Sequence, residues 1–364
     1  MNKKFTAVLF GGNSYEHDIS IVSAIVVMNE LKKINVSFIP IYITHEGIMY
    51  TGNALLDKKN YSSKKDFVIG NFISKGSYYF FKTKNKIFNI DFILPCVHGY
   101  GVEDGTISSF FDVLNIPIAC SSLATSMIFQ NKYLTKKLLS ELGIPSPMFK
   151  LLRKDSYINE IDTLLKEKDY IIKPNHLGSS VGVCSLNKDN IKDSLLKSFK
   201  YDDELLIEEK VPNLIEYNIA ICGNKNEYII SDIESIKTSK KGIYSFEEKY
   251  EVFRSNDSSF KMTMPFRLKE KIQQIATKIF TYFNCTGVVR FDFLYNSKSK
   301  ELFFNEANTI PGSLSIYLFT HKGYSFKEMY NLLKKVALIA YKNKNINLQK
   351  YGHDTLNKIN MNKY

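Results

Sequence analysis

The sequence predicts an α/β protein with an N-terminal doubly wound parallel sheet, followed by a larger part rich in antiparallel strands. Three observations predict this class. Strand-like and helix-like segments alternate through the first third, the run "NIDFILPCV" is almost wholly apolar as buried parallel strands are, and strand-like runs follow one another after Leu205. The 364 residues suffice for two or three domains.

Apolar spacing places the elements of the first third. The first strand ends at Gly11-Gly12, and apolar residues recur at helical spacing directly after it. This domain is expected to end near Cys120, and residues 52–86 show no clear period. Predicted strands cover residues 6–12, 36–44, 89–97 and 116–120, and predicted helices cover 19–34 and 103–114.

The rest of the chain begins with one long predicted helix from Ser122, which Gly143 and Pro145 stop. The segment "YIIKPNHLGSSVGVCSL" predicts two strands joined by a Gly-Ser loop, and "VVRFDFLYN" with "ELFFNEANT" predicts a hairpin around the polar turn "SKSK". Further strands are predicted at 148–152, 205–211, 215–223 and 227–236, and further helices at 156–167, 267–283 and 325–342.

Composition argues against nucleic-acid binding, a membrane span and secretion. The net charge of +12 comes mainly from lysines scattered along the chain, which favours a solvated surface over a nucleic-acid-binding face and attracts anionic substrates. No run of about 18 apolar residues predicts a membrane span, and the short apolar start predicts no secretion signal. The five cysteines lack CxxC spacing and are interpreted as buried thiols in a reducing cytoplasm.

The hairpin carries the most informative polar pattern. Side chains alternate between strand faces, so Arg290 and Asp292 share one face, as do Phe304, Glu306 and Asn308. One antiparallel register places Asp292 opposite Glu306 and Arg290 opposite Asn308. Two carboxylates and an amide oxygen are hard ligands suited to Mg²⁺. An ordinary charged sheet face is an equal alternative from the hairpin alone.

A glycine-serine loop is the second candidate. Lys173 ends an apolar strand, where its charge favours an anionic partner, and Ser179 and Ser180 follow in a loop rich in N–H and hydroxyl donors. The loop suits phosphate but has no Walker A spacing. A simple hairpin turn is the alternative.

Further candidate site residues lie at the ends of two predicted strands. Glu209 and Lys210 lie where a strand passes into a linker and could bond an adenine edge, with Glu216 within reach of ribose; read alone, a charged strand end is favoured. His98 follows the buried strand at its carboxyl end, where open α/β sheets place ligands, and Asp104 suits a helix cap. A bonded core histidine is an equal alternative.

Seven motifs in order then resemble one family. "LFGGNSYEHDIS", "VHGYGVEDGT", "NKYLTKKLL", "IIKPNHLGSSVGV", "YSFEEKYEV", "RFDF" and "NEANTIPGS" together are similar to the D-alanine–D-alanine ligases, a branch of the ATP-grasp carboxylate–amine ligases. The likeness spans residues 5 to about 343. It implies a three-part ATP-grasp fold: an N-terminal domain (1–121), a central lobe (122–208) and a C-terminal lobe (209–345) that grip ATP, and a Lys/Asn-rich tail (346–364).

The resemblance also implies residue roles. It implies nucleotide contacts for Lys132, Lys173, Ser180, Glu209, Lys210, Glu216 and Lys249, and two Mg²⁺ ions, with Mn²⁺ as a substitute, on Asp292, Glu306 and Asn308. It makes Glu16 the anchor of the first substrate's ammonium, hydrogen-bonded with Ser179 and Tyr250, and assigns an oxyanion to Arg290 and the Gly312 N–H. It implies substrate contacts for His98, Tyr244, Ser313, Ser315 and Tyr317, with residues 240–252 as a lid.

The implied reaction joins two D-alanine molecules through an acyl phosphate for peptidoglycan precursor synthesis in the cytoplasm. The resemblance also makes a homodimer an expected oligomeric state. The chain departs from the family pattern at Tyr317, where a serine is usual near the second substrate. A ligase for another acceptor, such as D-lactate, D-serine or another amino acid, therefore stays open. A nucleic-acid-binding protein, a non-catalytic nucleotide-binding relative and a redox Rossmann enzyme are the disfavoured alternatives.

Overall fold

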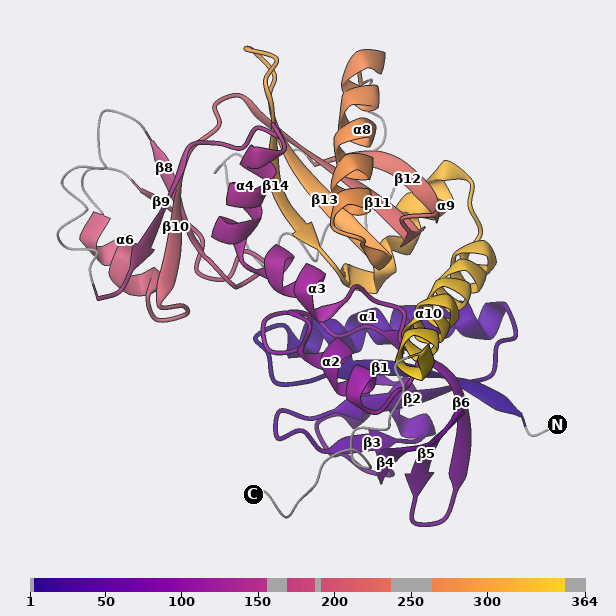
Figure 1. The fold of residues 1–364 in the computed structure, drawn as a ribbon. Helices are drawn as coiled ribbons and strands as arrows, with labels where there is room; N and C mark the ends of the chain where they lie inside the picture. Colours follow the sequence, from indigo (N-terminus) through magenta and orange to yellow (C-terminus); the bar gives the residue numbers. More distant parts are fainter. Residues whose placement is uncertain (1–2, 156–168, 187–190, 237–263, 351–364) are drawn as a thin grey trace, which may run out of the picture.

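The computed structural model describes residues 3–155, 169–186, 191–236 and 264–350 and divides into three sheets (Figure 1). The strand orders are β1-β2-β3-β4-β5-β6 in a closed sheet, β7-β10-β8-β9, and β12-β11-β13-β14. Three apolar clusters accompany these sheets. The predicted domain boundaries stay predictions, although each predicted part contains one sheet.

The N-terminal sheet is mixed, so the prediction of a doubly wound parallel sheet was wrong in part. β1 (Lys4–Gly11) pairs in parallel with β2 (Phe38–Ile43) and β6 (Ile87–Pro95), as predicted for the centre. The unpatterned segment adds β3 (Met49–Thr51), β4 (Val68–Lys75) and β5 (Tyr78–Thr83), all antiparallel, because backbone pairing there closes the sheet between β2 and β6. The strand predicted at 116–120 is only a bridge between Ile93 and Ile118.

Helices pack on this sheet. α1 (His17–Lys33) buries one face against β1, and α2 (Thr106–Val113) follows the β6 loop. Short 3₁₀ turns cover Asn53–Leu56 and Lys58–Asn60.

The long predicted helix is two helices, α3 (Leu123–Gln130) and α4 (Lys132–Glu141). Asn131 breaks it, with an extended backbone (φ −91°, ψ 101°) and a side chain that accepts a hydrogen bond from the N–H of Leu134. Asparagine competes in this way with helical hydrogen bonds and so starts a new helix instead of continuing the old one. Gly143 follows the end of α4 with φ 69°, as the predicted stop requires.

The second sheet holds β7 (Phe149–Arg153), β8 (Tyr170–Pro174), β9 (Cys184–Leu186) and β10 (Glu204–Glu209). The predicted strand pair around the Gly-Ser loop is confirmed as β8 and β9. α6 (Ile191–Ser198) packs on one face through Leu195, leaving the face with Lys173 toward the third sheet. The helix predicted at 156–167 lies outside the described residues.

The third sheet holds β11 (Leu214–Asn224), β12 (Glu227–Ile236), β13 (Thr286–Asn296) and β14 (Leu302–Asn308). α8 (Phe266–Tyr282) covers one face, which is apolar. The opposite face is polar at Arg290 and Asp292, called the polar face below, and apolar where Ala220, Cys222 and Val288 pack into the N-terminal cluster. Figure 1 shows α4 between the second and third sheets, where it contacts β7 of one and β14 of the other.

The C-terminal helices return to the N-terminal domain. After a 3₁₀ turn (Gly312–Ser315) and α9 (Ile316–Lys322), α10 (Phe326–Lys350) packs Met329, Leu333 and Ala337 into the N-terminal apolar cluster (Figure 1). The hydroxyls of Thr6 and Tyr330 are 2.8 Å apart across this contact.

Four of the five cysteines are buried, as predicted, and Cys184 is partly exposed. Among the described helices, none combines the length and the apolar character that a bilayer crossing needs.

Candidate functional site

The predicted register of the β13–β14 hairpin is confirmed. Asp292 pairs with Glu306 and Arg290 with Asn308, so these four side chains share the polar face of the third sheet. The placement of Phe304 on that face was wrong. A β-bulge between Asp292 and Phe293 makes Phe304 the partner of Phe293, and both rings lie in the apolar cluster under α8.

Arg290 and Asp292 form a bidentate ion pair. Arg290 Nε donates to Oδ1 at 2.7 Å and one terminal N donates to Oδ2 at 2.8 Å. Burial alone would lower the pKa of Arg290, but the Asp292 carboxylate outweighs burial and raises it. The guanidinium therefore stays charged, on the same face as Glu306 and Asn308.

The bulge also brings the second sheet to the third. Asn305 is the extra residue in β14, and its Oδ1 accepts a hydrogen bond from Lys173 Nζ at 2.8 Å. Bulges are a common means of re-aiming a side chain beside a functional site. Lys173 thus lies between two predicted sites: the Mg²⁺ ligands on β14 and the phosphate loop that follows β8.

Glu208, which the sequence did not single out, is the main carboxylate beside Lys173. Its Oε2 lies 2.8 Å from Lys173 Nζ, and its Oε1 lies 3.1 Å from the Nζ of Lys136 on α4. Burial opposes ionisation of Glu208, but the two lysines outweigh it and lower its pKa to about 2. Burial lowers the pKa of Lys136 to about 8. A buried cation–anion–cation row therefore joins α4, β10 and β8.

The register of β10 shows where the residues predicted to contact adenine, Glu209 and Lys210, lie. Because side chains alternate, Glu209 points to the face opposite Glu208 and Lys173, and its backbone N–H bonds the carbonyl of Met148. The backbone N–H of Lys210 bonds the carbonyl of Asp169. Glu216, in contrast, lies in β11 on the polar face with Asp292.

Lys132 lies beside the segment that leads into the glycine-serine loop. Lys132 is buried at the start of α4, and its Nζ donates to the carbonyl of Leu177, one residue before the loop. Burial lowers its pKa, although Glu306 acts in the opposite direction. Ser179 (φ 51°) and Ser180 (φ 59°) take left-handed conformations. Such conformations favour a loop whose backbone N–H groups point to the same side.

Glu16 lies between the loop after β6 and the glycine-serine loop. The hydroxyl of Ser179 donates to Glu16 Oε1, which confirms the predicted hydrogen bond. A Cβ on Gly99 would come within 2.8 Å of Glu16 Oε2, and one on Gly178 within 3.0 Å. Glycine at both positions therefore lets this carboxylate sit against the backbone.

His98 is a bonded core residue. Its Nδ1 is 2.8 Å from the carbonyl oxygen of Ile310, and its Nε2 is 2.7 Å from Ser23 Oγ. Burial lowers its pKa to about 4, so the ring is neutral at physiological pH. The direct substrate contact stays a prediction, and in this structure protein atoms occupy both ring nitrogens.

The predicted second-substrate residues lie directly after β14. Gly312 and Ser313 are half-buried, and the N–H of Ser313 donates to Ser23 Oγ at 3.1 Å. Ser315 Oγ is buried, and no hydrogen-bond partner is found for it among the described residues. The hydroxyl of Tyr317 donates to Glu234 Oε2 at 2.6 Å, and its ring lies within electrostatic reach of Arg290. Tyr244, Lys249 and Tyr250 lie outside the described residues.

Glu103 is a second carboxylate that the sequence did not assign to the site. It is buried and accepts hydrogen bonds from the N–H of Gly99 at 3.1 Å and the N–H of Ile310 at 2.9 Å. Burial, reinforced by the Glu16 carboxylate, raises the pKa of Glu103 to about 7. It ties the loop after β6 to the turn after β14. The predicted cap at Asp104 was wrong by one residue: Gly105 takes the cap position of α2, and Asp104, just before it, accepts from the N–H of Thr106.

Glu103 gives a testable pH dependence. Its folded pKa of about 7 exceeds the ordinary 4.5, so the proton stabilises the fold below pH 4.5, and this contribution is lost as pH rises to 7. We expect the free energy of unfolding of the native protein, relative to Glu103→Gln, to fall by roughly 3 kcal/mol across that window. Urea unfolding of both proteins between pH 4.5 and 8 measures this; parallel curves would mean that Glu103 is ionised throughout.

The hairpin donors fit Mg²⁺ in chemistry and position. Two carboxylates face each other across β13 and β14, and the buried Nδ2 of Asn308 has no hydrogen-bond partner among the described atoms, so no protein acceptor fixes this amide. The described residues contain no group of three His, Cys, Asp or Glu that could hold a metal, so the set needs the Asn308 amide as third donor. An ion here would share Asp292 with Arg290.

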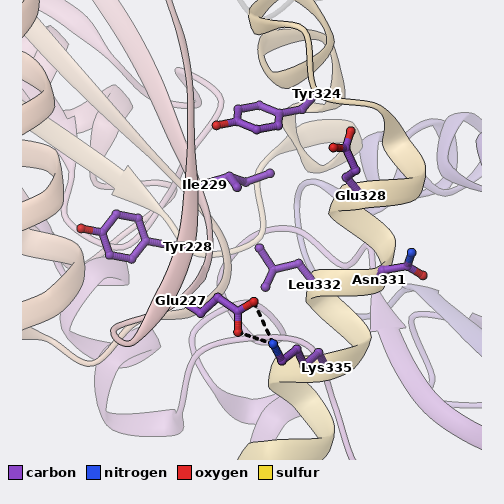
Figure 2. A pocket seen from close by; sticks show the side chains of 8 residues that line it. All are labelled: Glu227, Tyr228, Ile229, Tyr324, Glu328, Asn331, Leu332 and Lys335. Carbon is purple, nitrogen blue, oxygen red and sulfur yellow. Dashed lines mark hydrogen bonds and ion pairs between the residues drawn. The ribbon is translucent and has the colours of Figure 1, made fainter.

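A surface cavity of about 350 Å³ lies elsewhere, between β12 and α10 (Figure 2). Glu227 forms an ion pair with Lys335 at 2.6 Å at one end, and Ile229 and Leu332 form part of its lining. None of the predicted site residues lines this cavity. Convergent charged groups, and not this cavity, therefore define the candidate site.

The sequence contains only weak signals for the site residues that it did not assign: Lys136, Glu208 and Ser23. Lys136 follows Lys132 by four residues, which places both on one helix face, and Glu208 alternates into the face of Lys173. Ser23 sits on the apolar face of α1. A charged or hydroxyl side chain on an apolar face indicates a buried partner, but the partner's identity depends on tertiary contacts.

Comparison with known proteins gives consistent matches. Residues 6–121 match the family model described as D-ala D-ala ligase N-terminus, and residues 138–334 match D-ala D-ala ligase C-terminus. A D-alanine–D-alanine ligase of Thermosipho africanus is 34% identical over 359 residues, covering 96% of each chain, and one of Campylobacter jejuni is 34% identical over 323 residues, covering 86% of this chain and 88% of that protein.

Solved structures agree in fold. The D-alanine–D-alanine ligase of Helicobacter pylori superposes with a TM-score of 0.76 at 27% identity, covering 92% of this chain and 98% of that one. The VanG D-Ala:D-Ser ligase of Enterococcus faecalis gives 0.76 at 26% identity, covering 92% of this chain and 100% of that one.

Proposed function

This chain belongs to the D-alanine–D-alanine ligase family, and on that premise we propose that it joins two D-alanine molecules into D-alanyl-D-alanine in an ATP-dependent reaction. One observation carries the proposal. The hairpin register sets Asp292 opposite Glu306 and Arg290 opposite Asn308, while the bulged Asn305 bonds Lys173 from the sheet that carries the glycine-serine loop. Acidic donors and phosphate-binding cations thus meet at one place.

In the first step the carboxylate of one D-alanine attacks the γ-phosphorus of ATP, which releases ADP and leaves an acyl phosphate. Lys132 and Lys173 supply positive charge to the phosphates, and the loop at Ser179 and Ser180 supplies N–H and hydroxyl donors. Asp292, Glu306 and Asn308 would hold Mg²⁺, which neutralises phosphate charge when bound.

In the second step the amine of the other D-alanine attacks the acyl carbon, phosphate leaves, and the amine loses a proton. We assign the oxyanion to Arg290, whose charge Asp292 preserves, together with the N–H of Gly312. Glu16 holds the ammonium of the first substrate, and its bond from Ser179 links that anchor to the phosphate loop. Tyr250, Tyr244 and Lys249 remain lid residues by resemblance, and Glu209, Lys210 and Glu216 remain nucleotide contacts by resemblance.

Phosphate release tests the proposal. Purified protein with ATP, Mg²⁺ and D-alanine should release one phosphate for each D-alanyl-D-alanine found by mass spectrometry. Phosphate release with another acceptor but none with D-alanine would overturn the assignment. Peptidoglycan precursor synthesis, a cytoplasmic location and a homodimeric state follow from the same proposal as expectations.

A different acceptor is the second candidate, and Tyr317 favours it. The tyrosine hydroxyl donates to Glu234 within electrostatic reach of Arg290, and Tyr317 follows Ser315 by two residues. One solved relative is titled a D-Ala:D-Ser ligase. A mixture of D-alanine, D-serine and D-lactate, read by product mass, distinguishes the two candidates.

Tyr317 should control acceptor preference. We expect Tyr317→Ser to change the ratio of kcat/KM for D-alanine to that for D-serine at least ~10-fold, because it removes a partly buried ring and its bond to Glu234. Tyr317→Phe keeps the ring and should change the ratio less. An unchanged ratio in Tyr317→Ser would place the acceptor elsewhere.

A further inference from the structure

The turn that follows β14 has a strained backbone. Ser313, Leu314 and Ser315 all have positive φ, at 48°, 52° and 48°. Side-chain-bearing residues adopt this left-handed conformation at a cost of about 1–2 kcal/mol each, and such strain persists only where surrounding contacts impose it. The turn begins four residues after Asn308 and includes residues proposed above for the second substrate.

Three residues of the N-terminal domain impose this conformation. The N–H of Ile310 donates to Glu103, and the carbonyl of Ile310 is 2.8 Å from His98 Nδ1. Further along the turn, the N–H of Ser313 donates to Ser23 Oγ at 3.1 Å. Ser23 lies on α1 and is 3% exposed, so water does not compete for these bonds.

The direction of each proton in this chain is fixed. A carbonyl only accepts, so His98 Nδ1 carries the hydrogen that bonds Ile310. The ring is neutral because burial lowers the His98 pKa to about 4, so Nε2 must accept, and the Ser23 hydroxyl must donate to it at 2.7 Å. The lone pairs of Ser23 Oγ are then left for the N–H of Ser313. One hydroxyl therefore completes the link from the imidazole to the strained turn.

We propose that Ser23 is a positioning residue for the second substrate: its hydroxyl, oriented by His98, holds the left-handed turn and so directs the N–H of Gly312 and the side chains of Ser313 and Ser315. This inference rests on the proposed ligase function. Ser23 itself does not touch the reacting atoms. Its effect passes through the backbone of Ser313.

The chain offers a matched control one helical turn earlier. Ser20 is also buried on α1, where its Oγ accepts from the N–H of Gly11 at 2.7 Å and donates to the carbonyl of Cys96 at 2.7 Å. Ser20 and Ser23 thus each lose two buried hydrogen bonds on change to alanine. Only the bonds of Ser23 reach the turn after β14.

Kinetics and hydrogen exchange of both variants test the proposal. We expect Ser23→Ala to raise the KM of the second D-alanine about 10-fold or more with less than ~2-fold change in the KM of ATP, and to increase amide exchange in a peptide covering residues 309–316. Ser20→Ala should lower the urea midpoint similarly without either effect.

The possible outcomes separate a failure of this inference from a failure of the proposed function. Equal second-substrate KM values and equal exchange in the two variants would make Ser23 merely structural and overturn the inference. Faster exchange in Ser23→Ala with an unchanged second-substrate KM would also overturn it, because the turn would then not serve the acceptor. A native protein that makes no D-alanyl-D-alanine but protects residues 309–316 in a Ser23-dependent way would overturn the proposed function instead, and with it the acceptor role of the turn.

Discussion

Asp292→Asn lowers kcat by about 1,000-fold or more, and this is the largest effect expected on activity. The change removes the carboxylate opposite Glu306 and with it one charged ligand of the proposed Mg²⁺ site, which is worth several kcal/mol of transition-state stabilisation. It also removes the bidentate partner of Arg290. Steady-state phosphate release, measured over a range of Mg²⁺ concentrations, gives the result.

Asp292→Asn needs controls, because it changes the ion pair with Arg290 as well as the proposed metal site. Loss of one partner of a largely buried pair costs roughly 3 kcal/mol of stability, and urea unfolding must confirm that the variant remains folded during the assay. Glu306→Gln tests the same metal site without touching the Arg290 pair and should also lose most activity. Asp232, in β12 of the same sheet, pairs with Lys269 of α8 and His321 of α9, and Asp232→Asn should leave kcat within ~2-fold. Full activity in both Asp292→Asn and Glu306→Gln would refute the metal assignment.

Glu16→Gln should weaken binding of the first D-alanine by about 30-fold while changing the KM of ATP less than ~3-fold. The carboxylate lies against Gly99 and Gly178 and accepts a hydrogen bond from Ser179, so it has a fixed position from which to bind an ammonium group. A hydrogen bond to a charged group contributes about 1.5–3 kcal/mol, which sets the expected size. Initial rates at varied D-alanine and varied ATP separate the two constants.

Asp18→Asn is the matched control for Glu16→Gln. Asp18 is an exposed carboxylate two residues further along, in the first turn of α1, and its loss removes the same charge from the same region. It should leave both KM values within ~2-fold. If Glu16→Gln raises the KM of ATP as much as that of D-alanine, the carboxylate organises the phosphate loop through Ser179 and does not anchor the ammonium.

Much of the site could be predicted from the sequence because its central part is local. Strand alternation and a short polar turn are enough to pair Asp292 with Glu306 and Arg290 with Asn308, and the structure has this register. The link between Glu16 and Ser179 came from family resemblance and is also present. The error at Phe304 shows the limit of alternation, since one bulged residue changes the face of everything before it in the strand.

The sequence by itself therefore determined the strands outside residues 49–83 and 116–120, the hairpin register and the family, because these depend on periodicity and motif order within short stretches. Only the tertiary structure decided that the unpatterned segment closes the first sheet, that α10 packs on the N-terminal core, and that Glu208 is held between Lys136 and Lys173. It also decided that His98 supports the turn through Ser23. The physical reason is common to all four: each depends on which residues, far apart in the chain, exclude water from one another, and a polar side chain looks the same in sequence whether water or a buried partner satisfies it.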